Sequence, residues 1–159
     1  MYGLPPELLV FLASMFPIGE LRTGIPLGIF LGMQPLWAFF WGEFGNILIV
    51  MLALKLLKPI SSWLMAHSKF CNHIFLKIFH HTRNKHSTKI KKMGSFFLLA
   101  LTAIPIPGTG GLTGALVAFI FDLAYWPSIG LIFIGNIIAG ILVMFGAGGI
   151  MELIKLFIK

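Results

Sequence analysis

Long apolar stretches make up most of this chain, and proline, glycine and charged residues interrupt them in a repeating pattern. Four of the stretches are short, and they are residues 4–16, 24–33, 94–104 and 112–121. As a helix, a stretch of this length rises at most about 20 Å, whereas the hydrocarbon core of a bilayer is about 30 Å thick. Each consecutive pair therefore predicts a helical hairpin that enters a membrane, turns, and leaves on the side where it entered.

Two further stretches, residues 36–57 and 128–149, are long enough to cross a bilayer as helices. Two tryptophans lie at the start of the first stretch, and Lys55 and Lys58 lie at its end, as expected for residues at the two membrane surfaces. Each long stretch follows one of the predicted hairpins. The chain is therefore expected to contain two units, each a re-entrant helical hairpin followed by a full transmembrane helix.

The two units, residues 4–57 and 94–149, resemble each other at a shift of 90 positions. The matching residues are Gly45-Asn46-Ile47 with Gly135-Asn136-Ile137, Gly24 with Gly114, and Pro17 with Pro107. Because one full span separates the two hairpins, they would enter the membrane from opposite sides. The sequence thus predicts an all-α integral membrane fold of two inverted repeats, the arrangement of alternating-access transporters.

A second threading is compatible with the same pattern. In it, residues 94–121 form one broken span instead of a hairpin. This threading keeps the basic connection between the repeats inside but moves the carboxyl terminus to the cytoplasm. An accessibility label on Lys159 would separate the two arrangements.

Nine of the twelve Lys and Arg residues lie between Lys55 and Lys92, in the segment that connects the repeats. Such residues collect in cytoplasmic loops, so this segment is predicted to face the cytoplasm of a multi-pass protein in the inner membrane. Within residues 60–79, apolar residues recur at a helical period with basic residues between them, which predicts an amphipathic helix in the cytoplasmic interface. The positive charge therefore indicates topology, and nucleic acid is not an expected partner.

The composition is that of one membrane domain. The 159 residues are 58% hydrophobic, with a mean hydropathy of +0.96, well above the average of soluble proteins. We expect a single domain, residues 1–159, with a linker at 58–92 and a short tail at 150–159. Cys71 is the only cysteine, so no disulfide can form within the chain. No nucleotide loop, catalytic triad or metal-ligand spacing occurs, so an enzyme, a cofactor and a metal site are not expected.

The first break carries Glu20 and Arg22 at membrane depth. Each charge costs about 2.5 to 3.5 kcal/mol at the bilayer centre on insertion scales, which favours a functional role. The fixed fork of donors on Arg22 suits an anionic substrate. Glu20 would carry the proton, because a carboxylic acid among apolar groups can load and release a proton near neutral pH. The alternative is an ion pair that closes a loop at the level of the lipid headgroups.

The second break offers backbone instead of charge. Gly108, Thr109 and Gly110 precede a short apolar arm, and the exposed amides at a helix start attract anions. Thr109 is a candidate cap for that arm. If the two breaks face each other, the substrate-binding residues around one midplane cavity are expected to be Arg22, Pro26, Pro105, Pro107, Gly108, Thr109 and Gly110. The alternative is a tight turn packed against its counterpart.

Three polar residues lie in the two long stretches. Glu43 is a candidate second proton-coupling group, or alternatively an acid near the membrane interface. Asn46 and Asn136 are related by the repeat, and intramembrane asparagines usually form hydrogen bonds between helices. We therefore predict that the two asparagines serve helix packing.

At Glu20-Leu21-Arg22-Thr23-Gly24-Ile25-Pro26 and Pro105-Ile106-Pro107-Gly108-Thr109-Gly110, the chain resembles the putative small multidrug export protein family. It is also similar, as a distant relative, to the DedA membrane proteins. The first resemblance implies drug efflux, and the second implies paired re-entrant hairpins and the movement of lipid carriers. The DedA pattern has further acidic and arginine positions near its second hairpin, which this chain lacks.

These features together predict a small proton-coupled transporter that works as a homodimer. It would move an amphipathic or anionic substrate, a drug-like compound or a lipid phosphate, between the hairpins. One alternative is a polyprenyl-phosphate lipid flippase of the DedA type. Another is a non-transporting protein that organises membranes through its basic amphipathic helix. The expected partners are membrane lipids, protons and the substrate.

Overall fold

Seven α-helices and no β-strand make up the part of the chain that the computed structural model describes, which is residues 4–83, 88–106 and 108–157. The helices are α1 (Pro6–Met15), α2 (Leu21–Phe30), α3 (Pro35–His67), α4 (Lys69–Arg83), α5 (Thr88–Ala103), α6 (Gly111–Ile120) and α7 (Tyr125–Phe157). The predicted all-α fold is confirmed. The helices end at both predicted breaks, since α1 and α2 are separate and so are α5 and α6.

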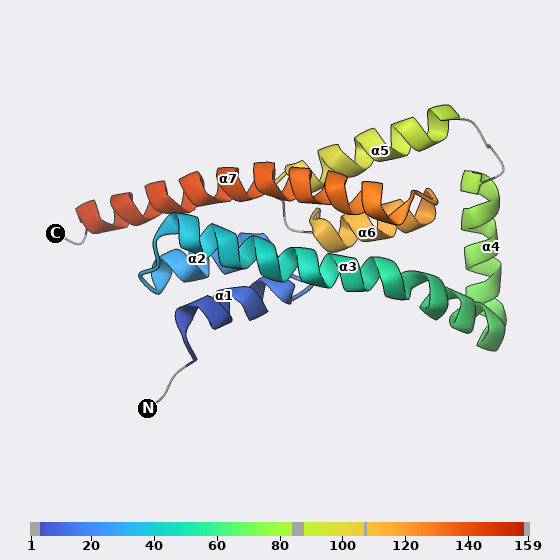
Figure 1. Cartoon of the computed structure of the whole chain (residues 1–159), viewed down its shortest axis with the longest axis horizontal. Helices are drawn as coiled ribbons and strands as arrows, with labels where there is room; N and C mark the ends of the chain where they lie inside the picture. The colour runs from blue at the N-terminus through green and yellow to red at the C-terminus, as the bar shows by residue number, and fades with distance from the viewer. Residues whose placement is uncertain (1–3, 84–87, 107, 158–159) are drawn as a thin grey trace.

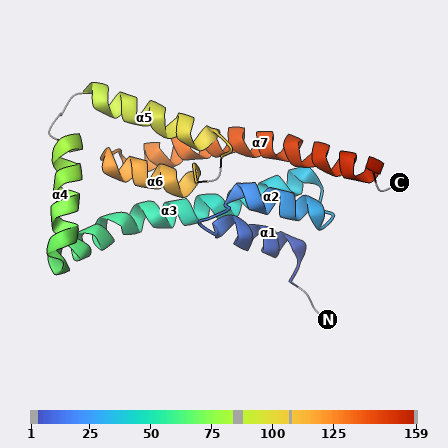
Figure 2. The same cartoon turned by 180° about the vertical axis from the view of Figure 1, so that it is seen from behind.

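The two longest helices, α3 and α7, lie side by side and run in opposite directions (Figures 1 and 2). The hairpin of α1 and α2 packs near the start of α3, and the hairpin of α5 and α6 packs near the start of α7. The turns of the two hairpins point toward each other near the middle of the molecule. Because α5 and α6 lie side by side in opposite directions, the structure differs from the threading that makes residues 94–121 one broken span.

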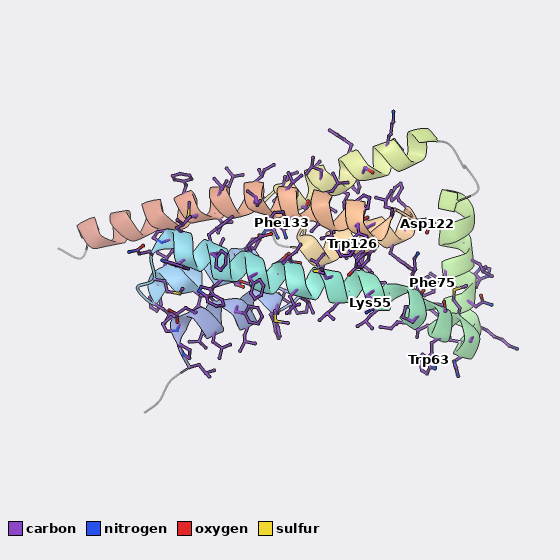
Figure 3. All side chains as sticks on the ribbon, in the orientation of Figure 1. Lys55, Trp63, Phe75, Asp122, Trp126 and Phe133 are labelled. Atoms are coloured by element: carbon purple, nitrogen blue, oxygen red, sulfur yellow. The ribbon has the colours of Figure 1, made fainter. Side chains whose placement is uncertain are left out.

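Two helices among the described residues, α3 and residues Tyr125–Ala147 of α7, are long and apolar enough to cross a membrane. Large apolar side chains project outward along both of them (Figure 3). Trp126, for example, exposes 71% of its surface. Apolar exposure on this scale is unusual for a soluble monomer but expected of a surface that faces lipid. This is a membrane protein.

The helix boundaries repeat at an interval of 90 residues. Both the starts and the ends of α2 and α6 differ by 90 positions, and so do the starts of α3 and α7. α2 and α6 also end in the same way, with left-handed backbone at Gly32 (φ 84°) and Asp122 (φ 51°). In each case the amide of the following residue donates back into the helix. Met33 donates to the Gly28 carbonyl over 2.9 Å, and Leu123 donates to the Ala118 carbonyl over 2.9 Å.

Small residues let the first arm of each hairpin approach its neighbours closely. A Cβ atom at Gly24 on α2 would overlap the hydroxyl oxygen of Ser14 on α1, and one at Gly45 on α3 would overlap the carbonyl of Phe11. In the second unit, the side chain of Thr102 on α5 takes the corresponding space beside Gly114 and Gly135. Such close approach provides packing between membrane helices in the absence of a hydrophobic driving force.

The basic connection differs from its prediction. The helix predicted for residues 60–79 is divided at Ser68, whose extended backbone (φ −134°, ψ 117°) ends α3 and separates it from α4. α3 continues through Pro59, and just after it the hydroxyl groups of Ser61 and Ser62 donate to the Lys58 carbonyl, over 2.9 Å and 3.0 Å. Periodicity missed the division because a single extended residue hardly changes the spacing of apolar positions.

The amphipathic piece that remains is α4, which lies across the end of α3 (Figure 1). The predicted linker, residues 58–92, is largely helical, because it contains the end of α3, all of α4 and the start of α5 at Thr88. Residues 84–87 of that linker lie outside the described residues. The long helix α7 also continues into the predicted tail, as far as Phe157.

Candidate functional site

The two breaks contact each other directly. The first contributes the side chains of Glu20 and Arg22, and the second contributes backbone groups between Ile104 and Leu112. The four short helices therefore meet where their hydrogen-bond ladders stop. At such ends, free amides and carbonyls need partners from elsewhere, and the side chains of the first break supply them to the second.

Glu20 begins its own helix but caps a different one. Its backbone has a positive φ of 50°, and its carbonyl accepts the amide of Gly24 over 3.1 Å at the start of α2. Its carboxylate instead accepts the amide of Gly111 over 2.7 Å and the amide of Leu112 over 3.0 Å, which are the first amides of α6. Glu20 is 5% exposed. The positive end of the α6 dipole favours a negative charge at this place.

Arg22 holds the other side of the second break. Its Nη2 donates to the carbonyl of Ile104 over 2.6 Å, to the carbonyl of Thr109 over 2.7 Å, and to the hydroxyl of Thr109 over 3.2 Å. Its Nη1 lies 3.6 Å from the Glu20 carboxylate. Ile104 directly follows α5, so the cation lies at the negative end of that helix.

Both charges thus match the helix end that they touch. The side chain of Glu20 is 6% exposed and that of Arg22 is 12% exposed, so the carboxylate is buried and the guanidinium is partly buried. Glu20 and Arg22 each lie closer to the backbone of the second break than to one another. The salt bridge between them is 3.6 Å long, which is longer than any of their hydrogen bonds to that backbone. The arrangement joins the two hairpins and is more than a local ion pair.

Thr109 does not cap α6, contrary to the predicted role. Gly110 is the residue before that helix, and no side chain of its own segment caps it. The Thr109 hydroxyl instead donates toward the carbonyls of Ile104 and Ile106, both at 2.8 Å. This geometry stabilises the turn that presents its backbone to Arg22. The cap is provided by Glu20 from the first break, because Gly110 leaves the space that the carboxylate occupies.

The other predicted substrate-binding residues form none of these hydrogen bonds with Glu20 or Arg22. Pro26 lies within α2, where it cannot donate to the carbonyl of Arg22. Pro105 and Gly108 are exposed in the second break, and Gly108 has a positive φ of 87°. Its carbonyl accepts the Thr113 hydroxyl over 2.8 Å. Pro107 lies outside the described residues.

The two predicted packing asparagines meet behind the contact. The Asn136 amide donates to the Asn46 side-chain oxygen over 2.6 Å, and Asn46 donates to the carbonyl of Ser14 over 3.4 Å. A Cβ atom at Gly111 would lie 2.5 Å from the same Asn46 oxygen, so this pair lies directly against the start of α6. The asparagines therefore connect both long helices to the place where the breaks meet.

Glu43 is the second buried acid. It lies in α3 and is 6% exposed, and neither carboxylate oxygen has a hydrogen-bond partner among the described residues. This burial is within the protein and gives no membrane depth, so both predicted roles of Glu43 stay predictions. An ionised carboxylate without partners is strongly disfavoured in such a place, whereas the neutral acid is tolerated.

Sequence reasoning missed the partners of the two charges. It expected Glu20 and Arg22 to face a cavity, but it did not identify the amides of Gly111 and Leu112 or the carbonyl of Ile104 as their contacts. The available signal was the pair Gly110-Gly111, since two adjacent glycines before a helix allow another chain segment to approach the backbone. Within the described residues, no group of three or more His, Cys, Asp or Glu residues could hold a metal ion.

Comparison with known proteins gives one match. The model of the family described as "Putative small multi-drug export protein" matches residues 20–142, which is most of the chain and includes both breaks. The match begins at Glu20. No curated protein and no solved structure matches the chain.

Proposed function

We propose that this chain, which belongs to the putative small multi-drug export protein family, is a proton-coupled membrane transporter for an amphipathic substrate with an anionic group. The observation that carries the proposal is the contact of the Glu20 carboxylate with the amides of Gly111 and Leu112, beside the Arg22 guanidinium. A phosphate or carboxylate of a substrate would use the same donors. Glu20 stands in the place of that substrate group.

In this proposal the hairpins are re-entrant and the repeats have inverted topology. The 90-residue offset of the helix boundaries and the opposite directions of α3 and α7 support it. Short helices that start at the bilayer midplane with their amide ends toward an anion are a feature of such transporters. Movement of one hairpin relative to the other would open the contact alternately to each side.

Competition between Glu20 and the substrate would provide the coupling. When the substrate anion takes the amides of α6 and the Arg22 guanidinium, the Glu20 carboxylate loses its partners in a buried place. A carboxylic acid there is more stable with a proton than without one. Binding of the anion is therefore linked to binding of a proton, and both would cross together. Glu43, which has no partner among the described residues, would be a second proton-binding group.

Transport by purified protein in lipid vesicles tests the proposal. The vesicles contain a pH-sensitive dye, and the probe is a fluorescent polyprenyl phosphate whose sidedness is measured by chemical quenching from outside. We expect the probe to cross the bilayer together with protons. Glu20→Gln and Arg22→Ala should each slow it by about tenfold or more, since hydrogen bonds to charged groups contribute about 1.5 to 3 kcal/mol.

Glu7→Gln is the matched control, because Glu7 is an exposed acid at the start of α1. It should leave movement of the anionic probe unchanged. Correct insertion of each variant is checked by its yield in vesicles and its helix content. Transport of the probe at the normal rate by both Glu20→Gln and Arg22→Ala would rule out the proposed site.

A lipid phosphate is the anionic substrate that the alternative function, a polyprenyl-phosphate flippase, would move. A cationic drug is the competing substrate class, and one feature favours it. Glu7, Trp37 and Trp41 line a hollow of about 530 Å³, within the size range of ligand pockets, in which the acid and the indole faces suit a lipophilic cation. Efflux of tetraphenylphosphonium that depends on Glu7 and not on Arg22 would favour the cation.

We further propose that the protein works as a homodimer. Ile18 and Ile106 lie in the two breaks and are 80% and 55% exposed. Backbone that is not helical is tolerated at membrane depth only where protein or water covers it. A second copy of the chain would supply the cover. Disulfide cross-linking of Ile18→Cys, in a background with Cys71→Ser, should give a dimer in membranes. If neither Ile18→Cys nor Ile106→Cys cross-links, the homodimer is excluded.

The topology is part of the proposal. The basic segment 55–92 faces the cytoplasm of the inner membrane, because Lys and Arg collect on that side. With both hairpins re-entrant, the carboxyl terminus lies on the same side as the amino terminus. Labelling Lys159 in intact cells with a membrane-impermeant reagent tests this arrangement, which requires the label to reach it from outside.

The alternative from another class is a protein that organises membranes through its basic amphipathic helix without transport. Its support is α4, whose exposed Lys69 and Lys77 lie among exposed apolar residues. This alternative expects Lys69→Gln with Lys77→Gln to impair function more than Glu20→Gln. The transporter proposal expects the reverse order.

A further inference from the structure

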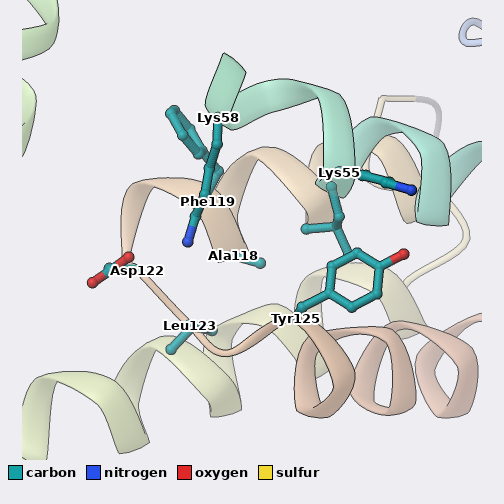
Figure 4. Close-up of a pocket in the computed structure, with 8 residues that line it drawn as sticks. Lys55, Lys58, Ala118, Phe119, Asp122, Leu123 and Tyr125 are labelled. Carbon is teal, nitrogen blue, oxygen red and sulfur yellow. The ribbon is translucent and has the colours of Figure 1, made fainter. Parts of the chain in front are cut away.

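A pocket with two lysines lies between α3 and the link from α6 to α7 (Figure 4). Its volume is about 150 Å³. The residues that line it are Leu54, Lys55, Lys58, Ala118, Phe119, Asp122, Leu123 and Tyr125. None of these residues takes part in the contact between the two breaks.

The polar groups of this pocket favour an anion. Lys55 and Lys58 come from adjacent turns of α3, and Figure 4 shows Lys58 extending past Phe119 toward the link that carries Asp122, whereas Lys55 extends the other way, on the side of the Tyr125 hydroxyl. Two lysines against one carboxylate leave a net charge of +1. Tyr125, which begins α7, donates its hydroxyl to the Met51 carbonyl over 3.2 Å. The pocket therefore also lies at the positive end of a long helix.

A second pocket, an apolar groove of about 170 Å³, lies on the other side of Phe119. It runs between α3, α4 and α6 and is lined by Leu57, Ile60, Ser61, Leu64, Phe75, Leu116, Phe119 and Ile120. Phe119 lines both spaces and packs edge-on against Phe75 with ring centroids 6.5 Å apart. The one polar side chain of the groove, Ser61, donates to the Lys58 carbonyl, so the groove surface is apolar.

We propose that the pocket and the groove together bind one anionic phospholipid, with its phosphate at Lys55 and Lys58 and an acyl chain in the groove. A cationic pocket beside an apolar groove at the end of a membrane span has the two-part chemistry of such a lipid. A soluble phosphate would use only the first part. Binding would hold α3, α4 and α6 together at the basic end, and it does not depend on transport at Glu20.

Native mass spectrometry of the full chain tests this site. The protein, in a neutral detergent, is mixed with equal amounts of phosphatidylglycerol and phosphatidylcholine that have the same acyl chains. We expect the wild type to retain one phosphatidylglycerol in preference. Lys55→Gln with Lys58→Gln should reduce this preference by about tenfold or more, because each basic residue near the surface adds to the attraction.

Two matched variants keep the test decisive. Lys69→Gln with Lys77→Gln removes the same charge from α4 and should leave the preference within about twofold, since those lysines are outside the pocket. Lys55→Arg with Lys58→Arg keeps the charge and should keep the preference, which serves as the control for folding. Equal losses from both glutamine pairs, no preference in the wild type, or displacement of the lipid by equimolar glycerol phosphate would each overturn the proposal.

Discussion

The side chains of Asn46 and Asn136 form a hydrogen bond of 2.6 Å between α3 and α7, and the two residues are 90 positions apart. Residues at equivalent positions of the two predicted repeats therefore contact each other. Both are almost completely buried, and α6 begins directly against Asn46. The start of α6, where the two breaks meet, therefore packs against a hydrogen bond between two residues that are 90 positions apart.

Asn46→Ala should destabilise the protein more than Asn136→Ala. Asn46 both accepts from Asn136 and donates to the Ser14 carbonyl, whereas the one contact described for the Asn136 side chain is with Asn46. Hydrogen bonds between membrane helices contribute about 0.6 kcal/mol on average and up to about 1.7 kcal/mol. Unfolding in mixed micelles, with the double variant to complete the cycle, measures both effects. Additive effects of the two single variants would contradict the hydrogen bond.

Gly110→Ala should impair transport as strongly as Glu20→Gln. The new Cβ atom would overlap the Glu20 carboxylate and displace it from the amides of α6. The backbone at Gly110 (φ −110°) accepts alanine without strain, so the effect would come from the overlap alone. Gly130→Ala in α7 is the control, since a Cβ atom there meets no neighbour. Normal transport by Gly110→Ala would show that the position of the carboxylate is unimportant.

Gly24→Ala should be destabilising, and Ser14→Ala should rescue it. The added Cβ atom would overlap the Ser14 hydroxyl oxygen, and overpacking of this kind costs about 1 to 3 kcal/mol. Ser14→Ala alone should be nearly neutral, because that hydroxyl is buried and has no partner among the described residues. Thermal unfolding of the two single variants and the double variant measures the rescue. A double variant no more stable than Gly24→Ala would mean that another contact limits the space.

The helical class and the ends of the short helices could be predicted from the sequence. Pro17, Pro105 and the glycines near them indicated where the short helices stop, and the shared Gly-Asn-Ile motif led to the prediction of a repeat. Both signals are local, because they depend on missing backbone donors and on positions where only small residues fit. The division of the basic segment at Ser68 was missed, since no proline or glycine marks it.

The contacts of the site could not be predicted from the sequence. Glu20 and Arg22 were identified as important because charge is rare in membrane segments, but this argument gives no partner. Their partners are backbone groups of Gly111, Leu112 and Ile104, which any residue type would offer. Only the three-dimensional arrangement of the hairpins brings those groups to the two charges.

Arg22→Lys should retain less than about a tenth of the transport rate, despite its conserved charge. The guanidinium bonds the Ile104 carbonyl and both oxygen atoms of Thr109 and lies near Glu20 through its other nitrogen. The compact ammonium of lysine cannot extend donors to both sides at once. Vesicle transport of the fluorescent polyprenyl phosphate measures the loss. A lysine variant with the wild-type rate would mean that positive charge alone is sufficient.

Glu43→Gln should separate proton movement from substrate binding. Glutamine keeps the size of the side chain but cannot bind or release a proton. If Glu43 takes up a proton during transport, the variant should still bind the fluorescent probe while dye-detected proton movement falls, and the rate should depend less steeply on pH because Glu20 alone remains to bind a proton.

Glu20→Gln should behave differently, because Glu20 accepts two amide hydrogen bonds that glutamine can only partly replace. Its loss should weaken the contact between the hairpins as well as the coupling, so both probe binding and proton movement should change. Comparing the two variants over a range of pH therefore assigns the roles of the two acids. If Glu43→Gln transports probe and protons as the wild type does at every pH, Glu43 is a neutral packing residue, and Glu20 remains the single candidate for coupling among the buried acids of the described chain.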